Sequence, residues 1–227
     1  MIRRIAGVVV RPRTILAGLA HSPAWMDTWL FILVAFAVCG AALLSTAIGQ
    51  QALVDERVRV VESFGGTVDD REYAALQAHP PTWIYLASGG RLLITPPVTL
   101  LVAAGCWAIA RNDEKAVSFR QVLSIVVHAS VVLALGQIIA APIDYVRESL
   151  TSPLNLAAVL PFTDEGTIAS RILGAVDVFV LWWVALLAIG LSALTRRRAR
   201  RYAWSLAAAY VGFAAVIAVV ITAAGGS

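Results

Sequence analysis

The chain has 227 residues, of which 59% are hydrophobic and 14% charged, and its formal net charge is +4 at pH 7. Soluble domains contain roughly 45–50% apolar residues, so this composition excludes an ordinary soluble domain and predicts a protein that resides in lipid. Cys39 and Cys106 lie in separate apolar runs without paired Cys or His spacing, so neither a disulfide framework nor a zinc site is indicated.

Residues 1–27 form a leader in which basic and apolar residues alternate, with Pro12 and Pro23 as interruptions. This pattern predicts an amphipathic N-terminal helix that lies flat on an anionic cytoplasmic leaflet. The alternative is that the leader is only a positively charged flank of the first membrane span.

Five apolar segments follow within a membrane domain at residues 28–224. A helix of about 20 apolar residues crosses the hydrocarbon core of a bilayer, because it satisfies its own backbone hydrogen bonds. We therefore predict an all-α fold, a polytopic membrane protein with five transmembrane helices at residues 29–48, 83–110, 122–141, 176–194 and 203–224.

The basic residues alternate between the two sides of these predicted spans. The leader, the connection between spans two and three, and the connection between spans four and five are rich in lysine and arginine, whereas the outer connections 49–82 and 143–173 are richer in acids. By the positive-inside rule the N-terminus is cytoplasmic and the C-terminus lies outside. Residues 149–163 are too short and too interrupted by proline to span, so they are either re-entrant or surface-lying.

Charged residues at membrane depth are costly and are usually paired or functional. Arg91 falls inside the second predicted span, and Asp144 and Asp177 fall at the outer ends of the third and fourth. We expect Arg91 to pair with Asp177 or Asp144. This pair is interpreted as a structural contact, and a substrate or proton site is the alternative.

Other polar and helix-breaking residues also lie within the spans. Pro96 and Pro97 remove two backbone donors near the middle of the second span and predict a kink. His128 and Gln137 lie within the third span, where no acid at matching depth favours a proton relay, so we expect His128 to be a hydrogen-bonded packing residue.

The run TRRRARR after the fourth span carries five arginines: Arg196, Arg197, Arg198, Arg200 and Arg201. Two flanking spans hold this run at the membrane face without a folded basic domain, so we expect contact with anionic lipid head groups or a protein partner and no nucleic-acid binding. The sequence contains no catalytic or nucleotide-binding motif. No enzymatic activity, cofactor or metal is therefore expected.

Several stretches resemble the Yip (Ypt-interacting protein) domain family of five-span membrane proteins, particularly its bacterial members. They are RPRTILAGL in the leader, FRQVLSIVVHAS entering the third span, SPLNL, and DVFVLWWVALLAIGLSAL in the fourth span. The eukaryotic members are linked to vesicle trafficking and to prenylated Rab-type GTPases. Their long cytoplasmic domain and Tyr/Gly/Pro-rich motifs are not evident here, so the resemblance does not imply GTPase binding for this chain.

These observations predict a non-enzymatic protein of a prokaryotic inner membrane, either membrane-organising or an accessory subunit. Its expected partners are anionic lipids and a membrane protein or a second copy, with Ser205, Ala209 and Gly212 as a small-residue face for helix association. A small transporter or channel with a polar site around Arg91 and the Pro96-Pro97 kink is the alternative.

Overall fold

The computed structural model describes residues 2–78, 82–114, 116–150, 154–156, 173–174 and 176–224, with side chains for 3–78, 92–114, 116–150, 154–156, 173–174 and 176–223. This part of the chain is helical, and its β-type pairing is limited to an isolated bridge between Asn155 and Asp177. The helices are α1 (Ile2–Val10), α2 (Pro12–His21), α3 (Met26–Leu44), α4 (Ala47–Ser63), α5 (Asp70–Ala78), α6 (Thr82–Asp113), α7 (Phe119–Ala129), α8 (Val131–Arg147), α11 (Val178–Thr195) and α12 (Ala199–Ala224).

Among the described residues, five helical segments are long and apolar enough to cross a membrane. They are Met26–Leu44, Leu92–Asp113, Phe119–Arg147, Val178–Thr195 and Ala199–Ala223. The prediction of an all-helical protein with five spans is confirmed. The leader is also helical, but it forms two helices, because Pro12 occupies the first turn of α2 and Arg11 leaves the helical conformation just before it.

The first span ends earlier than its predicted limit at residue 48. Thr46 adopts an extended conformation and its hydroxyl accepts a hydrogen bond from the Gly49 amide at 3.0 Å, which caps α4. A Cβ atom at Gly49 would lie 2.0 Å from the main-chain oxygen of Leu43, so glycine is required at this bend. Apolar residues after Leu44 therefore begin α4 rather than extending α3.

The chain divides into two compact units. Unit 1 contains Met1–Phe36, Arg91–Gln137 and Phe179–Ala208, and unit 2 contains Ala37–Gly90, Ile138–Val178 and Ala209–Ser227. In unit 2, the helices α4 and α5 are joined by side-chain hydrogen bonds: Tyr73 donates to Asp55 Oδ1 at 2.8 Å, and Gln77 donates to Gln51 Oε1 at 2.9 Å.

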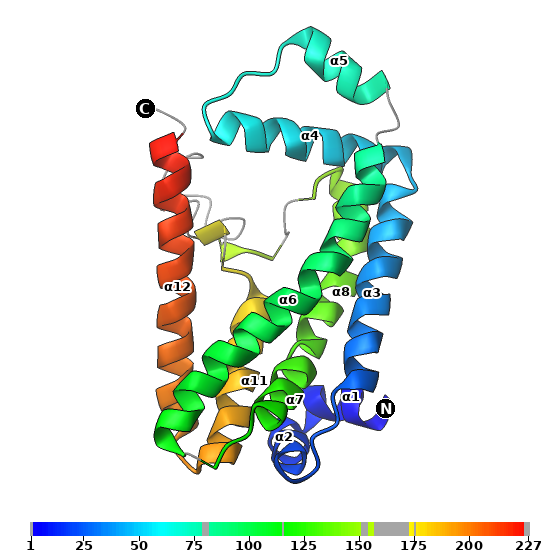
Figure 1. Cartoon of the computed structure of the whole chain (residues 1–227). Coiled ribbons are helices and arrows are strands. Elements are labelled where there is room, and N and C mark those ends of the chain that lie inside the picture. The colour runs from blue at the N-terminus through cyan, green and yellow to red at the C-terminus, as the bar shows by residue number, and fades with distance from the viewer. Residues whose placement is uncertain are drawn as a thin grey trace. The chain divides into compact units, whose positions relative to one another are not determined.

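Helix α7 lies at the centre of unit 1 (Figure 1). Residues 122–129 are all buried, and the leader helices α1 and α2 pack against α7. The chain enters α7 through a capping box, in which Ser118 and Gln121 each bond the backbone of the other. Ile125 packs so closely on α11 that a Cβ atom at Gly190 would lie 2.3 Å from its Cγ2.

Candidate functional site: a basic helix end and an apolar cavity

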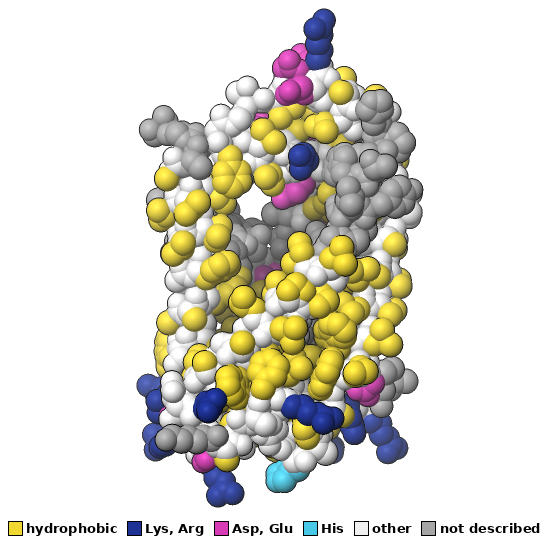
Figure 2. Space-filling view, viewed as in Figure 1, with side chains coloured by type: hydrophobic (Ala, Val, Ile, Leu, Met, Phe, Trp, Pro, Cys, Tyr) yellow, Lys and Arg dark blue, Asp and Glu magenta, His cyan; other side chains and the backbone are white. Residues whose placement is uncertain are grey.

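One end of unit 1 is strongly basic. It is formed by the leader, the α6–α7 connection and the α11–α12 connection, and Figure 2 shows arginine side chains, in dark blue, gathered where Figure 1 places these elements. Among the described side chains of unit 1, eleven arginines face three acids. The arginines are all exposed: Arg3, Arg4, Arg11, Arg13, Arg111, Arg120, Arg196, Arg197, Arg198, Arg200 and Arg201. We call this surface the basic end.

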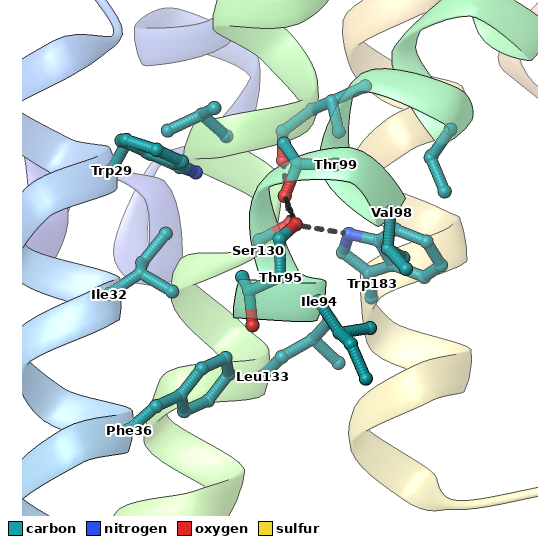
Figure 3. Close-up of a pocket in the computed structure, with 13 residues that line it drawn as sticks. Trp29, Ile32, Phe36, Ile94, Thr95, Val98, Thr99, Ser130, Leu133 and Trp183 are labelled. Carbon is teal, nitrogen blue, oxygen red and sulfur yellow. Dashed lines mark hydrogen bonds between the residues drawn. The ribbon is translucent and has the colours of Figure 1, made fainter. Parts of the chain in front are cut away.

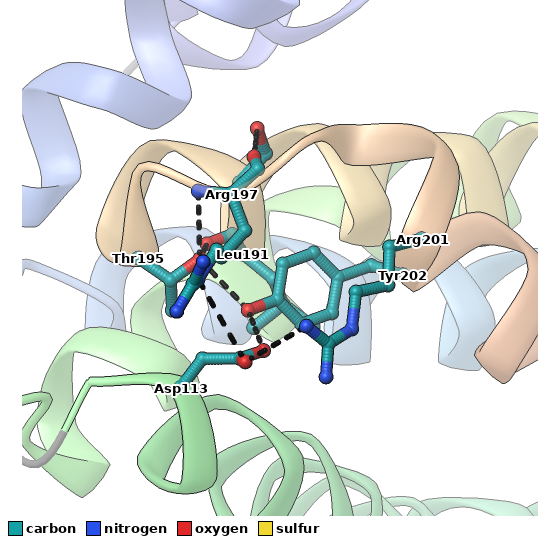
Figure 4. A network of polar contacts seen from close by, with 7 residues as sticks. Asp113, Leu191, Thr195, Arg197, Arg201 and Tyr202 are labelled. Carbon is teal, nitrogen blue, oxygen red and sulfur yellow. Dashed lines mark hydrogen bonds and ion pairs between the residues drawn. The ribbon is translucent and has the colours of Figure 1, made fainter.

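At the basic end, the carboxylate of Asp113 joins the last turn of α6 to the start of α12 (Figure 4). The side chain of Asp113 is only 7% exposed, and Arg201 Nη1 lies 3.1 Å from its Oδ1. Arg197 Nε lies 3.9 Å from the same oxygen. The fully buried Tyr202 donates its hydroxyl proton to Asp113 Oδ2 at 2.7 Å. Two positive charges and one hydroxyl proton therefore converge on a carboxylate that is nearly removed from solvent.

The turn between α11 and α12 is held by the same group of contacts. Thr195 Oγ1 lies 2.8 Å from the Tyr202 hydroxyl oxygen and 3.4 Å from the backbone nitrogen of Arg197. Arg196 adopts a positive φ of 57°, a conformation that residues with a Cβ rarely adopt. We call Asp113, Thr195, Arg197, Arg201 and Tyr202 the Asp113 network.

Asp113 also offsets an electrostatic conflict in the sequence. The N-terminus of a helix carries partial positive charge, so arginines in the first turn of α12 are unfavourable there. The contacts of Asp113 with Arg201 and Tyr202 place a negative charge against that turn. The network therefore stabilises a concentration of arginine that the helix itself opposes.

Hydrogen bonds from side chains of α7 to main-chain oxygens of the leader hold the leader against α7. Gln121 donates to the main-chain oxygen of Ala20 at 2.7 Å, and Ser124 donates to that of Ala24 at 3.1 Å. Further in, the fully buried His128 ring lies 2.8 Å from Ser124 O and 3.1 Å from Thr28 Oγ1. Because a carbonyl oxygen only accepts, Nδ1 of His128 carries a proton, which in a neutral ring leaves Nε2 as the acceptor for the Thr28 hydroxyl.

Unit 1 also contains an apolar cavity of about 290 Å³ (Figure 3). Its walls come from α3, α6, α7, α8 and α11. Hydroxyl groups contribute little to the lining, and none of the lining residues is charged. The lining consists of Trp29, Ile32, Phe36, Ile94, Thr95, Val98, Thr99, Val102, Val126, Val127, Ser130, Leu133 and Trp183.

The intramembrane residues singled out from the sequence have different outcomes. The side chain of Arg91 lies outside the described residues, so its expected pairing with Asp177 or Asp144 stays a prediction. Pro96 and Pro97 lie inside α6, which continues through them.

Two further polar residues named from the sequence can be located within unit 1. Gln137 is half-buried on α8, and His128 makes the two contacts given above. The Thr99 hydroxyl donates to Thr95 O at 2.7 Å. Pro96 and Pro97 have no N–H group, so the carbonyls of Leu92 and Leu93 lack their usual helical donors. The Thr99 hydroxyl does not replace these donors, because its proton is used in the bond to Thr95 O.

Asp113 was not singled out from the sequence, although its carboxylate contacts three side chains at the basic end. The available signal was the pair of acids in the stretch RNDEK, which a count of positive charges alone does not include. Arg197 and Arg201 were expected to contact lipid or a partner, and the structure shows that both also form ion pairs with Asp113. Among the described residues, no group of three or more His, Cys, Asp or Glu side chains is placed to hold a metal ion.

Five apolar helical segments, with the leader packed against α7, define a polytopic α-helical membrane protein. The family model of the Yip1 domain matches residues 6–222, and the chain belongs to this family. The predicted resemblance is thereby confirmed over nearly the whole chain. No curated protein and no solved structure matches the chain.

Proposed function

We propose that this Yip1-domain protein acts without catalysis as a membrane-organising or accessory subunit in a prokaryotic inner membrane. In this proposal the basic end faces the cytoplasm and binds anionic lipid head groups together with a membrane-protein partner. Membership of a family that is not known for enzymes supports the non-catalytic part. The alternation of basic and acidic connections supports the orientation.

The observation that carries this proposal is the Asp113 network. Orienting a span requires only an excess of Lys and Arg in a short loop, and acids contribute little to that signal. A nearly buried carboxylate that fixes Arg197 and Arg201 is not needed for orientation. Its effect is to hold the turn in one shape, with Arg196, Arg198 and Arg200 exposed on it. A fixed turn with three exposed guanidinium groups is suited to recognising phosphate or carboxylate groups.

The expected energies favour a lipid contribution to this binding. Each basic residue near an anionic membrane surface contributes about 1 kcal/mol. Replacing Arg196, Arg198 and Arg200 by glutamine therefore removes about 3 kcal/mol of attraction. Arg197 and Arg201 remain, so the Asp113 network and the orientation signal are preserved in this triple variant.

The test is chemical crosslinking in native membranes followed by pull-down in mild detergent. The matched control replaces Arg57, Arg71 and Arg147, which are exposed in unit 2, by glutamine and so removes the same charge. We expect the basic-end variant to lose its co-purifying partner and its enrichment of anionic lipid, and the control to keep both. Equal recovery from the two variants contradicts the proposal.

The cavity gives no support to the transporter alternative. A polar or ionic solute requires polar groups that replace its water, and the lining of this cavity has no charged side chain. The two ideas differ in reconstituted vesicles. Solute flux through proteoliposomes, together with no reproducible partner in the pull-down, overturns the accessory role.

A further inference from the structure

Three polar side chains on the cavity wall, those of Thr99, Ser130 and Trp183, donate hydrogen bonds to other atoms of the wall. Thr99 donates to Thr95 O at 2.7 Å, and Ser130 donates to Val126 O at 2.9 Å. The indole nitrogen of Trp183 donates to Ser130 Oγ at 3.2 Å. These donors are used within the wall, so an occupant meets mainly aliphatic side chains and ring faces. The chemistry of the lining therefore selects a hydrocarbon.

The cavity is accessible from the surface that faces lipid. Ile94 and Val98 line it from α6, and they are 61% and 51% exposed. Both residues belong to a segment that is apolar enough to span a membrane. Side chains that lie on the outside of such a helix and also line a cavity place that cavity within reach of neighbouring acyl chains.

The size of the cavity excludes a partner helix as its occupant. Its lining covers Trp29 to Phe36 on α3 and Ile94 to Val102 on α6, which is about two helical turns or about 12 Å of each. A helix with its side chains is about 10–12 Å wide, and a span needs about 20 residues. A volume of about 290 Å³ is too small for two turns of such a helix but admits a slender chain.

The basic end determines which kind of chain is favoured. Trp29 lies in the first turn of α3, which follows the leader, and packs edge-on against Trp25 with ring centroids 6.0 Å apart. A chain that enters the cavity beside Trp29 brings its head group toward an end where arginines greatly outnumber acids. We propose that the cavity holds one acyl chain of an anionic phospholipid whose head group lies at the basic end. The head-group preference rests on the proposed function, whereas the occupancy of the cavity does not.

A cavity-filling variant with a matched control tests this site. Val98→Trp fills the cavity, and Leu101→Trp adds the same side chain to α6 at a residue that is 74% exposed and does not line the cavity. Each full-length protein is equilibrated in mild detergent with equal phosphatidylglycerol and phosphatidylcholine, washed, and analysed by native mass spectrometry. We expect the unaltered chain and Leu101→Trp to retain about one phosphatidylglycerol per chain, and Val98→Trp to retain about tenfold less, which corresponds to about 1.4 kcal/mol.

Three results overturn the proposal: equal retention by Val98→Trp and the unaltered chain, equal loss in both tryptophan variants, or equal retention of the two lipids. A second measurement needs no variant. Phosphatidylglycerol with brominated acyl chains, added at one equivalent per chain, is expected to quench tryptophan emission through Trp29 and Trp183, and absence of quenching contradicts occupancy. The arginine triple variant leaves the cavity unchanged, so failure of the proposed function is distinguishable from failure of this site.

Discussion

Neutralising Asp113 provides the most direct test of the network at the basic end. Asp113→Asn keeps the shape of the side chain and an oxygen that accepts from Tyr202, but it removes the charge that Arg197 and Arg201 share. We expect the variant to be less stable, because a side chain only 7% exposed loses its charge while the two cationic partners remain in place.

The magnitude follows from the burial of each partner. A hydrogen bond to a charged acceptor is about twice as strong as a neutral one and contributes about 1.5–3 kcal/mol, so converting the Tyr202 contact to a neutral one costs about 1 kcal/mol. Arg197 and Arg201 are 57% and 62% exposed, so solvent screens both ion pairs, and each contributes about 0.2–1 kcal/mol. The expected total is about 2 kcal/mol.

The assay uses the two cysteines of the chain. Cys106 is only 2% exposed, so its reaction with a thiol-specific dye on heating reports unfolding, and a Cys39→Ala background removes the half-buried second thiol. At about 2–4 °C per kcal/mol for a chain of this size, Asp113→Asn is expected to lower Tm by about 4–8 °C.

The control and a double-mutant cycle determine whether the network is responsible. Glu114→Gln removes the same charge from the neighbouring exposed residue and is expected to change stability by less than about 0.5 kcal/mol. Tyr202→Phe combined with Asp113→Asn is expected to show a coupling of about 1 kcal/mol. Equal Tm shifts for Asp113→Asn and Glu114→Gln, or strict additivity in the cycle, refute the reasoning.

Two further predictions concern other parts of the chain. Gly190→Ala places a Cβ atom 2.3 Å from Ile125 Cγ2, and we expect it to lower the free energy of unfolding by about 1–3 kcal/mol, measured by thermal unfolding. Gly212→Ala adds a Cβ atom with no other atom within 4 Å and is expected to be neutral. A larger loss of stability for Gly212→Ala than for Gly190→Ala argues against close α7–α11 packing. In unit 2, the hydrogen bond to Asp55 raises the pKa of Tyr73 above its ordinary value of 10.0. The contribution of the protonated hydroxyl to stability is therefore complete below pH 10 and lost as the pH rises through the higher pKa. Ultraviolet titration of phenolate absorbance, as the difference between the unaltered chain and Tyr73→Phe, is expected to show an ionisation above pH 10, and a midpoint at or below that value contradicts the contact.

The fold was predictable because its main determinant, the length of each apolar run, can be read directly from the sequence. A helix in lipid satisfies its own backbone, so the length of an apolar run is enough to identify a span. The positions of the helix ends depend on local contacts that run length does not report. The bend at Thr46 and Gly49 is an example, because the apolar residues on both sides of it read as one run while the cap divides them into α3 and α4.

The candidate site was predictable only in its charges. The arginine run was identified from the sequence, but Asp113 and Tyr202 are separated by 89 positions and meet through the packing of α6 against the start of α12. The cavity was not predictable either. Most of its lining residues are ordinary apolar residues of five helices. The space between them depends on how their side chains pack together and not on the type of any one residue.

The packing of the leader determines how it can take part in the proposed binding of lipid. An amphipathic helix that inserts into a leaflet needs a free apolar face. In α1 and α2 the residues Val8, Leu16 and Leu19 are 0%, 0% and 3% exposed, and they belong to the protein core around α7. The face that remains carries exposed arginines, Arg3 and Arg13 among them, together with the large exposed apolar side chain of Val10. In the proposed binding of anionic lipid we therefore expect the leader to act through its charge, and we expect its contribution to weaken with increasing salt in a way that insertion of an apolar face does not.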